Sequence, residues 1–270
     1  MIYLDNESIR KLQLTELEIL IEIDRICKKN HIHYSLTGGT LLGAVRHGGF
    51  IPWDDDADIS MLRSEYRKFQ EACRKDLDTN RFYFQDIENT EGYRWGYGKM
   101  RRKDSVFLRE NQEDMPYEQG IFVDIFPRDG VPDGVLGQKV HAFLCFLVRK
   151  TMWSAVGRKT SKKKIQRRVY QQLYQLSSNN MPHIYKKLVK FSNKKRTRYV
   201  RALTFPLPNG LKGYEREWYR KYTEIEFEGH VFQVESSYKK WLEQEFGDYM
   251  QLPPSEKRKI HPVTEIKFPN

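Results

Sequence analysis

The sequence predicts an α+β fold, a core interrupted by a basic helical insertion, and three observations support this prediction. An amphipathic helical pattern opens the chain, short alternating segments typical of strands continue to about residue 130, and from about residue 134 the pattern is helical again. We therefore expect three parts: a core over residues 1–133, a basic helical segment over 134–214, and an α/β tail over 215–270 that completes the core.

The N-terminal part is predicted to alternate helices and strands. Apolar residues recur at helical spacing from about residue 7 to residue 29, and the pattern ends near Asn30. Next, "IHYSLTGG" predicts a short strand that runs into a glycine turn, "TLLGAVRHG" a short helix, "DADISML" a strand and "RSEYRKFQEACRKDL" a helix. Further strands are predicted at "RFYFQDI", "GYRWGYGKMRR", "SVFLRE" and "GIFVDIFP".

The remaining elements are three basic helices and a short tail. The helices are predicted at "GQKVHAFLCFLVRKTMWSAVG", "SKKKIQRRVYQQLYQL" and "MPHIYKKLVKFSNKKR". The tail is predicted to contain a hairpin, "TEIEFEGHVFQV", and a helix, "SSYKKWLEQEFG", that Gly247 ends.

The formal net charge of +11 is concentrated in the helical segment. Residues 134–214 contain 19 Lys and Arg but no Asp or Glu, whereas the rest of the chain has 28 basic and 36 acidic residues. This asymmetry indicates an anionic partner: a membrane surface, a nucleic acid or a phosphate-bearing polymer. The first helix of this segment, "GQKVHAFLCFLVRKTMWSAVG", favours a membrane surface as the partner because cationic residues lie beside its apolar side. The alternative is a core helix that is covered by basic residues. That apolar side consists of Phe143, Leu144, Phe146, Leu147, Met152 and Trp153.

Other features indicate a reducing compartment. No run approaches the roughly 18 apolar residues of a membrane-spanning helix, and the N-terminus lacks the basic and apolar regions of a signal peptide. Cys27, Cys73 and Cys145 are odd in number and widely spaced in apolar surroundings. They are therefore predicted to be buried thiols rather than a disulfide framework or a zinc site.

Candidate functional residues are densest in "LTGGTLLGAVRHGGFIPWDDDADISM". Its four carboxylates within five residues repel one another unless a cation neutralises them. On a strand, Asp56 and Asp58 point to the same face, where both can hold a hard cation such as Mg²⁺. A third carboxylate, Asp124 in "GIFVDIFP", is flanked by apolar residues, where an unpaired charge is costly. Gly38 and Gly39 have no side chains that would keep a ligand away from the backbone at the start of a helix. The free N–H groups of a helix N-terminus favour the binding of phosphate.

Each part of this pattern also has an ordinary structural explanation. An acidic run is commonly a solvated turn, and a Gly-Gly pair is commonly a tight turn. A calcium loop is disfavoured because Ile59 stands where such a loop needs Gly, and no helix leads in across Pro52. The combination is more specific than its parts and indicates metal-assisted phosphoryl chemistry.

The blocks "GTLLGAVRHGGFIPWDDDADI" and "FVDIFPRDG" resemble the two hallmark blocks of the LicD family of bacterial phosphotransferases, and "WLEQEFGDYMQLPPSEKRKIHP" resembles its C-terminal block. The resemblance covers residues 15 to 130 and 215 to 262, and it implies a nucleotidyltransferase-like mixed-sheet core. The family often has another aliphatic residue at the position of Ala57 and Leu at the position of Arg128.

The resemblance implies a role for each candidate residue. Asp56, Asp58 and Asp124 would hold Mg²⁺ or Mn²⁺ and act in catalysis, with Asp124 as the base, and Asp54 would support them. The donor phosphates would lie against Gly38 and Gly39. Further candidate substrate-binding residues, for which ordinary packing or surface charge is the alternative, are Arg46, His47, Lys99, Arg101, Arg258 and His261.

The resemblance further implies transfer of phosphocholine, or a related phospho head group, from a CDP-choline-type donor to a sugar hydroxyl, with release of CMP. The acceptor would be a lipid-linked precursor of a cell-surface glycan such as lipopolysaccharide or teichoic acid. The enzyme would then be cytoplasmic and peripheral at the anionic inner face of the bacterial cytoplasmic membrane, with no nucleic acid as partner. Tyr93, Trp95 and Tyr97 are a candidate aromatic box for choline, although aromatic residues at strand spacing commonly form core.

Two alternatives remain open. The first is a small-molecule nucleotidyltransferase, which would use the same metal site and release diphosphate. The second is a non-enzymatic membrane or nucleic-acid binder that uses residues 134–214.

Overall fold

The computed structural model describes residues 4–207, 212–254, 256, 258 and 260–269. Its α-helices are α1 (Asn6–Lys29), α2 (Gly38–His47), α3 (Arg63–Asp76), α4 (Val135–Thr160), α5 (Lys164–Ser177), α6 (Met181–Ser192) and α7 (Tyr238–Phe246). Its strands are β1 (Ser35–Leu36), β2 (Ala57–Leu62), β3 (Phe82–Gln85), β4 (Gly98–Arg102), β5 (Val106–Arg109), β6 (Phe122–Val131), β7 (Tyr199–Arg201), β8 (Tyr214–Glu215), β9 (Tyr222–Phe227), β10 (His230–Glu235) and β11 (Val263–Lys267).

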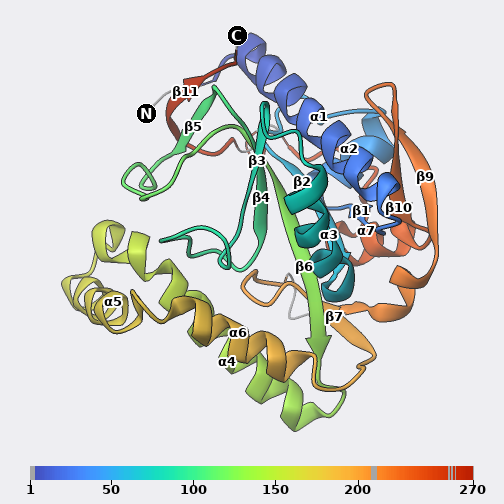
Figure 1. Cartoon of the computed structure of the whole chain (residues 1–270). Coiled ribbons are helices and arrows are strands. Elements are labelled where there is room, and N and C mark those ends of the chain that lie inside the picture. The colour runs from blue at the N-terminus through green and yellow to red at the C-terminus, as the bar shows by residue number, and fades with distance from the viewer. Residues whose placement is uncertain (1–3, 208–211, 255, 257, 259, 270) are drawn as a thin grey trace.

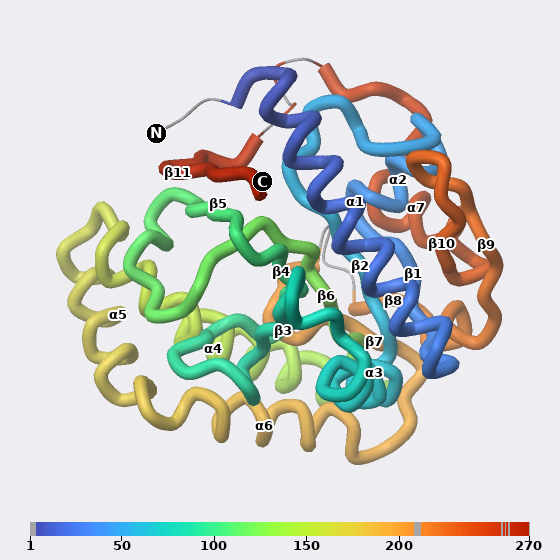
Figure 2. The backbone as a smooth tube through the Cα atoms, turned by 45° about the horizontal axis from the view of Figure 1, so that its top comes forward, coloured from blue at the N-terminus to red at the C-terminus, as the bar shows by residue number. Residues whose placement is uncertain are grey.

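A mixed sheet of seven strands forms the centre of the molecule (Figure 1). Its main order is β1-β2-β6-β4-β3, and β7 and β8 continue from the far end of β6. Strands β2 and β6 are parallel, and the other neighbours are antiparallel. Outside this sheet, β9 and β10 form a hairpin, and β11 pairs with β5, beside which it lies in Figure 2. The predicted α+β class with a mixed sheet is confirmed.

The two faces of the sheet differ in chemistry. On one face, Ala57, Ile59 and Met61 of β2 are fully buried with Val123 and Ile125 of β6 in the main hydrophobic core. Helices α1 and α3 contact these strands and cover that face. Because side chains alternate along a strand, Asp58 and Asp124 must point to the opposite face. The carboxylates of Asp58 and Asp124 therefore lie on the face of the sheet opposite the main core.

The C-terminal tail returns to the N-terminal core. Strand β10 contacts β1, where the Ser35 hydroxyl donates a hydrogen bond to the buried carboxylate of Glu235. Burial raises the pKa of Glu235 to about 7, against the opposing effect of that hydrogen bond. On the other side of the hairpin, Glu228 pairs with Arg10 of α1 at 2.7 Å and accepts a hydrogen bond from the Phe50 amide.

Helices α4, α5 and α6 form a separate layer below the sheet in Figure 1, as the basic helical pattern predicted. A second hydrophobic core joins α4 and α6 to the segment before β4. Its buried members are Ile87, Tyr93, Cys145, Val148, Met152, Met181, Tyr185, Leu188, Val189 and Leu203.

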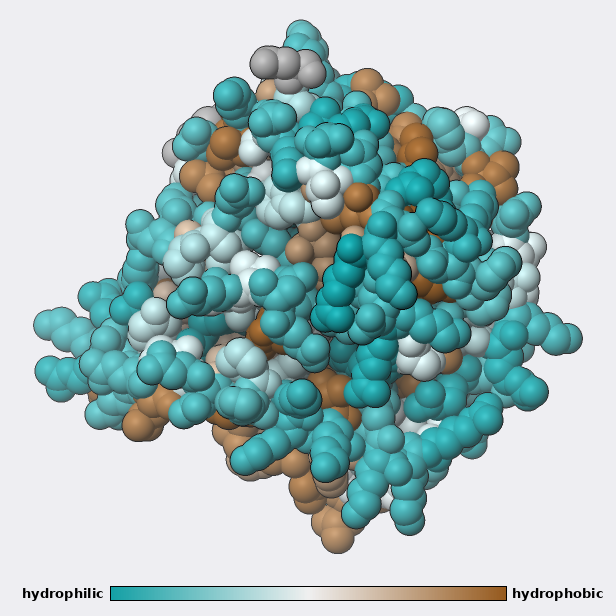
Figure 3. Space-filling view, viewed as in Figure 1, coloured by the Kyte–Doolittle hydropathy of each residue, from teal (hydrophilic) through white to brown (hydrophobic). Residues whose placement is uncertain are grey.

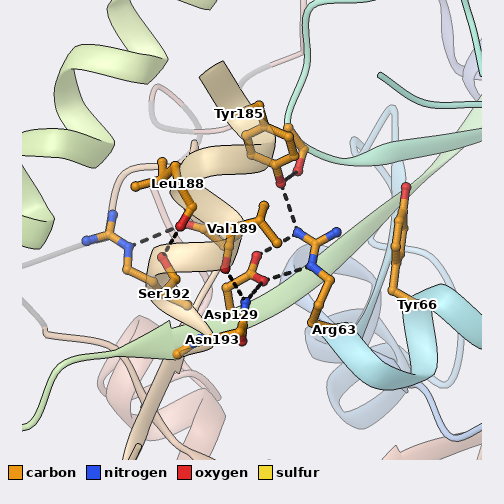
Figure 4. A network of polar contacts seen from close by, with 12 residues as sticks. Arg63, Tyr66, Asp129, Tyr185, Leu188, Val189, Ser192 and Asn193 are labelled. Carbon is orange, nitrogen blue, oxygen red and sulfur yellow. Dashed lines mark hydrogen bonds and ion pairs between the residues drawn. The ribbon is translucent and has the colours of Figure 1, made fainter. Parts of the chain in front are cut away.

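A buried polar network connects this layer to the sheet (Figure 4). Asp129 of β6 accepts two hydrogen bonds from the guanidinium of Arg63, at 2.8 and 2.6 Å, and a third from Asn193 at 2.6 Å. Arg63 also donates to the hydroxyl of Tyr185 on α6, at 2.9 Å. The network therefore holds the end of β6, the start of α3 and the end of α6 together.

Three sequence predictions need correction. The strand predicted over "GYRWGYGKMRR" begins only at Gly98, because Arg94 leaves the sheet and donates hydrogen bonds to backbone carbonyls of Thr151 and Met152 in α4. The glycine turn is instead the first turn of α2, which starts at Gly38. The predicted apolar side of α4 is partly packed, since Met152 is buried in the second core and Leu144 packs against it.

Two expectations about the whole chain agree with the structure. Cys27, Cys73 and Cys145 are free, buried thiols. Among the described residues, no helix combines the length and the apolar character needed to cross a bilayer.

Candidate active site

Asp58, Asp124 and Lys99 lie next to one another on three adjacent strands. The register pairs Asp58 of β2 with Asp124 of β6, and Asp124 with Lys99 of β4. The Lys99 ammonium lies 2.5 Å from a carboxylate oxygen of Asp124, and both side chains are about 6% exposed. The sheet therefore brings together two carboxylates and a cation from segments that are 25 to 66 residues apart in sequence.

This row carries strong electrostatic coupling. Burial raises the pKa of the Asp58 carboxyl well above its usual range, and the negative charges of Asp56 and Asp124 raise it further. Burial also lowers the pKa of Lys99 to about 7, against the opposing charge of Asp124. Asp58 thus lies where a further positive charge would be strongly stabilised.

Asp56 lies just before β2 and belongs to a second charged group. Its carboxylate pairs with Arg109 of β5 at 2.9 Å and lies 3.8 Å from Nδ1 of His261. His261 also contacts Asp55, with 2.9 Å between Nδ1 and a carboxylate oxygen and a backbone hydrogen bond of 3.0 Å. Burial raises the pKa of Asp56, but the charges of Arg109 and His261 outweigh it and lower that pKa.

A possible metal-binding group is present here. Among the described residues, ligand atoms of Asp55, Asp56 and His261 all lie within 4.8 Å of one another. The predicted ligands Asp58 and Asp124 lie in the neighbouring row, so Asp56 connects the two sets. The sequence analysis had placed His261 only as a substrate contact.

The first turn of α2 is fixed against β2 at this point. The amide of Asp58 donates to the hydroxyl of Thr40 at 2.8 Å, and the amide of Thr37 donates to the carbonyl of Asp58 at 3.1 Å. Gly38 has a φ of +60°, and a Cβ there would lie 2.9 Å from an Asp58 carboxylate oxygen. A Cβ on Gly39 would overlap the Asp54 carboxylate. The positive φ at Gly38 therefore favours glycine, and a side chain at either position would displace a neighbouring carboxylate.

The other predicted substrate-binding residues lie farther out or are engaged by the protein. Arg46 donates to the carbonyls of Tyr249 and Gln251, and His47 makes an edge contact with Trp53. The exposed Arg258 lies over the ring of Trp53, 4.2 Å from its centroid. Buried Arg101 donates to Gln85 and to the carbonyl of Gly120, so its guanidinium is occupied internally.

Two charged residues near the site were missed by the sequence analysis. Arg109 faces Asp56 from a short strand that carries no motif. Glu16 of α1 is buried, one of its carboxylate oxygens lacks a partner among the described residues, and its pKa is raised by burial and by the charge of Asp56. Glu16 lies on the apolar stripe of α1, between Leu12 and Leu20, and an acid at such a position was a usable signal.

Comparison with known proteins places the chain in a family. Residues 31–136, which span β1 to β6, match the family model described as "LicD/FKTN/FKRP, nucleotidyltransferase domain". Lipopolysaccharide cholinephosphotransferase LicD of Haemophilus influenzae is 33% identical over 271 residues, covering 96% of this chain and 97% of that protein. An uncharacterized protein of Rickettsia prowazekii, RP689, is 26% identical over 137 residues, which cover 48% of this chain and 47% of that protein.

Similarity over nearly the whole length of both chains assigns this protein to the transferase enzymes. More narrowly, the chain belongs to the LicD family. The alternative of a non-enzymatic membrane or nucleic-acid binder is thereby disfavoured.

Proposed function

We propose that this enzyme transfers phosphocholine, or a related phospho head group, from a CDP-linked donor to a sugar hydroxyl of a cell-surface glycan precursor and releases CMP. The observation that carries the proposal is the row of Asp58, Asp124 and Lys99 beside the first turn of α2. The similarity to a lipopolysaccharide cholinephosphotransferase supports the choice of head group and of acceptor.

The carboxylate set fits a divalent cation. Asp56, Asp58 and Asp124 offer hard oxygen ligands, and burial, together with the negative charges of Asp56 and Asp124, raises the pKa of Asp58. Mg²⁺ or Mn²⁺ held by these residues would neutralise the donor diphosphate. Asp55 and His261 lie close enough to Asp56 to serve a second ion or to orient that ligand.

The chain's own residues have the following proposed roles. Asp124 takes the proton from the acceptor hydroxyl, and its hydrogen bond with Lys99 fixes the orientation of the carboxylate. The amides at the start of α2, at Gly38 and Gly39, bind the phosphate oxygens. Catalysis consists mainly of positioning and charge neutralisation, as in other phosphoryl transfers.

We assign these roles to a nucleotidyltransferase-like core formed by residues 1–133 and completed by residues 215–270. The contacts of β10 with β1 and of β11 with β5 support the inclusion of the tail. Residues 134–214 form the basic helical segment, which the second hydrophobic core attaches to this core.

The reaction is tested by product analysis. With CDP-choline, Mg²⁺ and a lipid-linked glycan, we expect phosphocholine on the glycan and CMP in solution, and no product in the presence of a chelator. Mass analysis of the glycan and chromatography of the nucleotide give both readouts. Diphosphate together with a nucleotidylated acceptor would establish the nucleotidyltransferase alternative instead.

We also propose that α4 rests on the anionic inner face of the cytoplasmic membrane. Leu136, Val140, Phe143 and Leu147 are exposed, and their spacing places them on one side of α4, opposite the side that is buried. Apolar atoms gather at the lower edge of the molecule in Figure 3, below the sheet. Residues 134–214 contain no acidic residue, so an anionic surface is attracted, whereas a second copy of the same face is repelled.

Vesicle binding tests this surface. Replacing Leu136 and Phe143 together by Ser should weaken binding to phosphatidylglycerol vesicles by at least about tenfold, because two apolar side chains no longer enter the interface. The matched control is Ile165→Ser, a similarly exposed apolar residue on α5. Co-sedimentation measures the binding, which should fall as salt rises. Equal binding by the double variant and the wild type would reject this surface.

A further inference from the structure

A group of three aromatic rings, of which Phe205 is the exposed one, lies beside the carboxylate row. Tyr97 precedes β4, Phe126 lies in β6, and Phe205 follows β7. The ring centroid of Phe126 is 4.7 Å from that of Tyr97 and 5.2 Å from that of Phe205, and the Tyr97 and Phe205 centroids are 6.5 Å apart. The ring of Phe205 is inclined by 77° and 68° to the other two, so the three rings form a corner rather than a stack.

This corner lies on the same sheet face as the carboxylates. Phe126 is two residues beyond Asp124 on β6, and Tyr97 is two residues before Lys99, so both rings continue the row of Asp124 and Lys99 by one step. The Lys99 ammonium links the two groups, because it lies 2.5 Å from an Asp124 oxygen and 5.4 Å from the centroid of Tyr97.

The corner differs from ordinary core packing. Among the described residues, neither hydrophobic core includes Tyr97, Phe126 or Phe205. Phe205 is 48% exposed although it contacts two other rings, and the nearby Trp153, whose ring is 6.0 Å from that of Trp95, is 38% exposed. Phe126 is buried and Tyr97 is half-buried, so the exposed ring of Phe205 is the part of the corner that core formation does not explain.

We infer that Tyr97, Phe126 and Phe205 form the binding site for the quaternary ammonium of the transferred head group and select it over a primary ammonium. This inference rests on the proposed function. A quaternary ammonium cannot donate a hydrogen bond, so aromatic faces and nearby carboxylates are the groups that recognise it. Two carbons and one ester oxygen separate its nitrogen from the phosphorus, a reach that suits the short distance between the corner and Asp124.

The corner also revises the predicted aromatic box. Tyr93 is buried, and its hydroxyl donates to the carbonyl of Tyr97 at 3.0 Å, so it supports the backbone of the corner rather than presenting a ring. Trp95 packs against the second core and donates to the Tyr117 hydroxyl. Of the three residues in the predicted box, Tyr97 alone contacts Phe126 or Phe205 among the ring contacts of the described residues.

The variant Phe205→Leu tests the inference, because it keeps an apolar side chain and removes the ring. We expect the KM for CDP-choline to rise about tenfold with little change in kcat, and the KM for CDP-ethanolamine to stay nearly unchanged. Phosphocholine binding, measured by calorimetry, should weaken by a similar factor. The matched control is Phe191→Leu, at a Phe of similar exposure on α6. It should change neither the KM for CDP-choline nor the binding of phosphocholine.

The outcomes separate this inference from the proposed function. If the wild type transfers nothing from CDP-choline but binds phosphocholine, and Phe205→Leu weakens that binding, the site stands while the proposed reaction fails. Unchanged phosphocholine binding by Phe205→Leu overturns the site, whatever the turnover. An equal rise in KM for both donors also overturns it, because the ring would then serve only packing.

Discussion

Replacing Asp58 or Asp124 by Asn should lower the rate of head-group transfer by about a thousandfold, because each change removes a carboxylate that we propose as a ligand of the catalytic cation. Turnover of CDP-choline in the presence of Mg²⁺ measures the effect. The matched control is Asp114→Asn, since Asp114 is exposed and pairs with Lys159 of α4. Retention of more than a tenth of the wild-type rate by either variant would remove the carboxylate row from the mechanism.

The two variants should differ in stability. The pKa of Asp58 is raised in the fold, so its ionised form is disfavoured, and Asp58→Asn should raise the melting temperature of the metal-free protein. The stability that protonated Asp58 contributes is present at low pH and is lost as the pH rises through the pKa of Asp58 in the folded protein. The rise in melting temperature caused by Asp58→Asn should therefore be larger at pH 8 than at pH 5. Asp124→Asn should instead lower the melting temperature, because Lys99 loses its buried partner.

Asp129→Ala should reduce the free energy of unfolding by about 3–5 kcal/mol, because it leaves the buried guanidinium of Arg63 without its carboxylate. The same change removes an acceptor from Asn193, so the end of α6 loses one of its two side-chain hydrogen bonds to β6 among the described residues (Figure 4). Equilibrium denaturation in urea measures the loss.

Two further variants assign that loss to the network. The double variant Arg63→Met with Asp129→Leu should recover much of the stability, since it removes both charges together. Glu215→Ala, which breaks the exposed pair with Arg198, should have a much smaller effect than Asp129→Ala. If Asp129→Ala behaved like Glu215→Ala, the network would not hold the helical layer to the sheet.

Many of the helices and strands were predictable because they follow from the spacing of apolar residues within short stretches of sequence. The 3.6-residue periodicity of α1 and the helices of the basic segment, and the alternation in "DADISML", gave the correct elements. Asp124 could be singled out because an acid among apolar strand residues has few structural explanations. These inferences needed only neighbours in sequence.

Other features depend on contacts that no local pattern encodes. Strands β7 and β8 have three and two residues, too few to show an alternation. The departure of Tyr93 and Trp95 from the sheet depends on α4, which supplies the acceptors for Arg94 some 57 residues later. The pairing of Arg109 with Asp56 likewise follows from the placement of β5, which β11 fixes from the end of the chain.

The contact between Ser35 and Glu235 has a consequence for how the protein folds during synthesis. These residues are 200 positions apart, so the sheet edge at β1 stays uncovered until nearly the entire polypeptide has left the ribosome. Contacts of such high sequence separation slow folding, and an uncovered strand edge is prone to mispairing. The edge at β1 is therefore the place where we expect mispairing of the nascent chain to begin before β10 arrives.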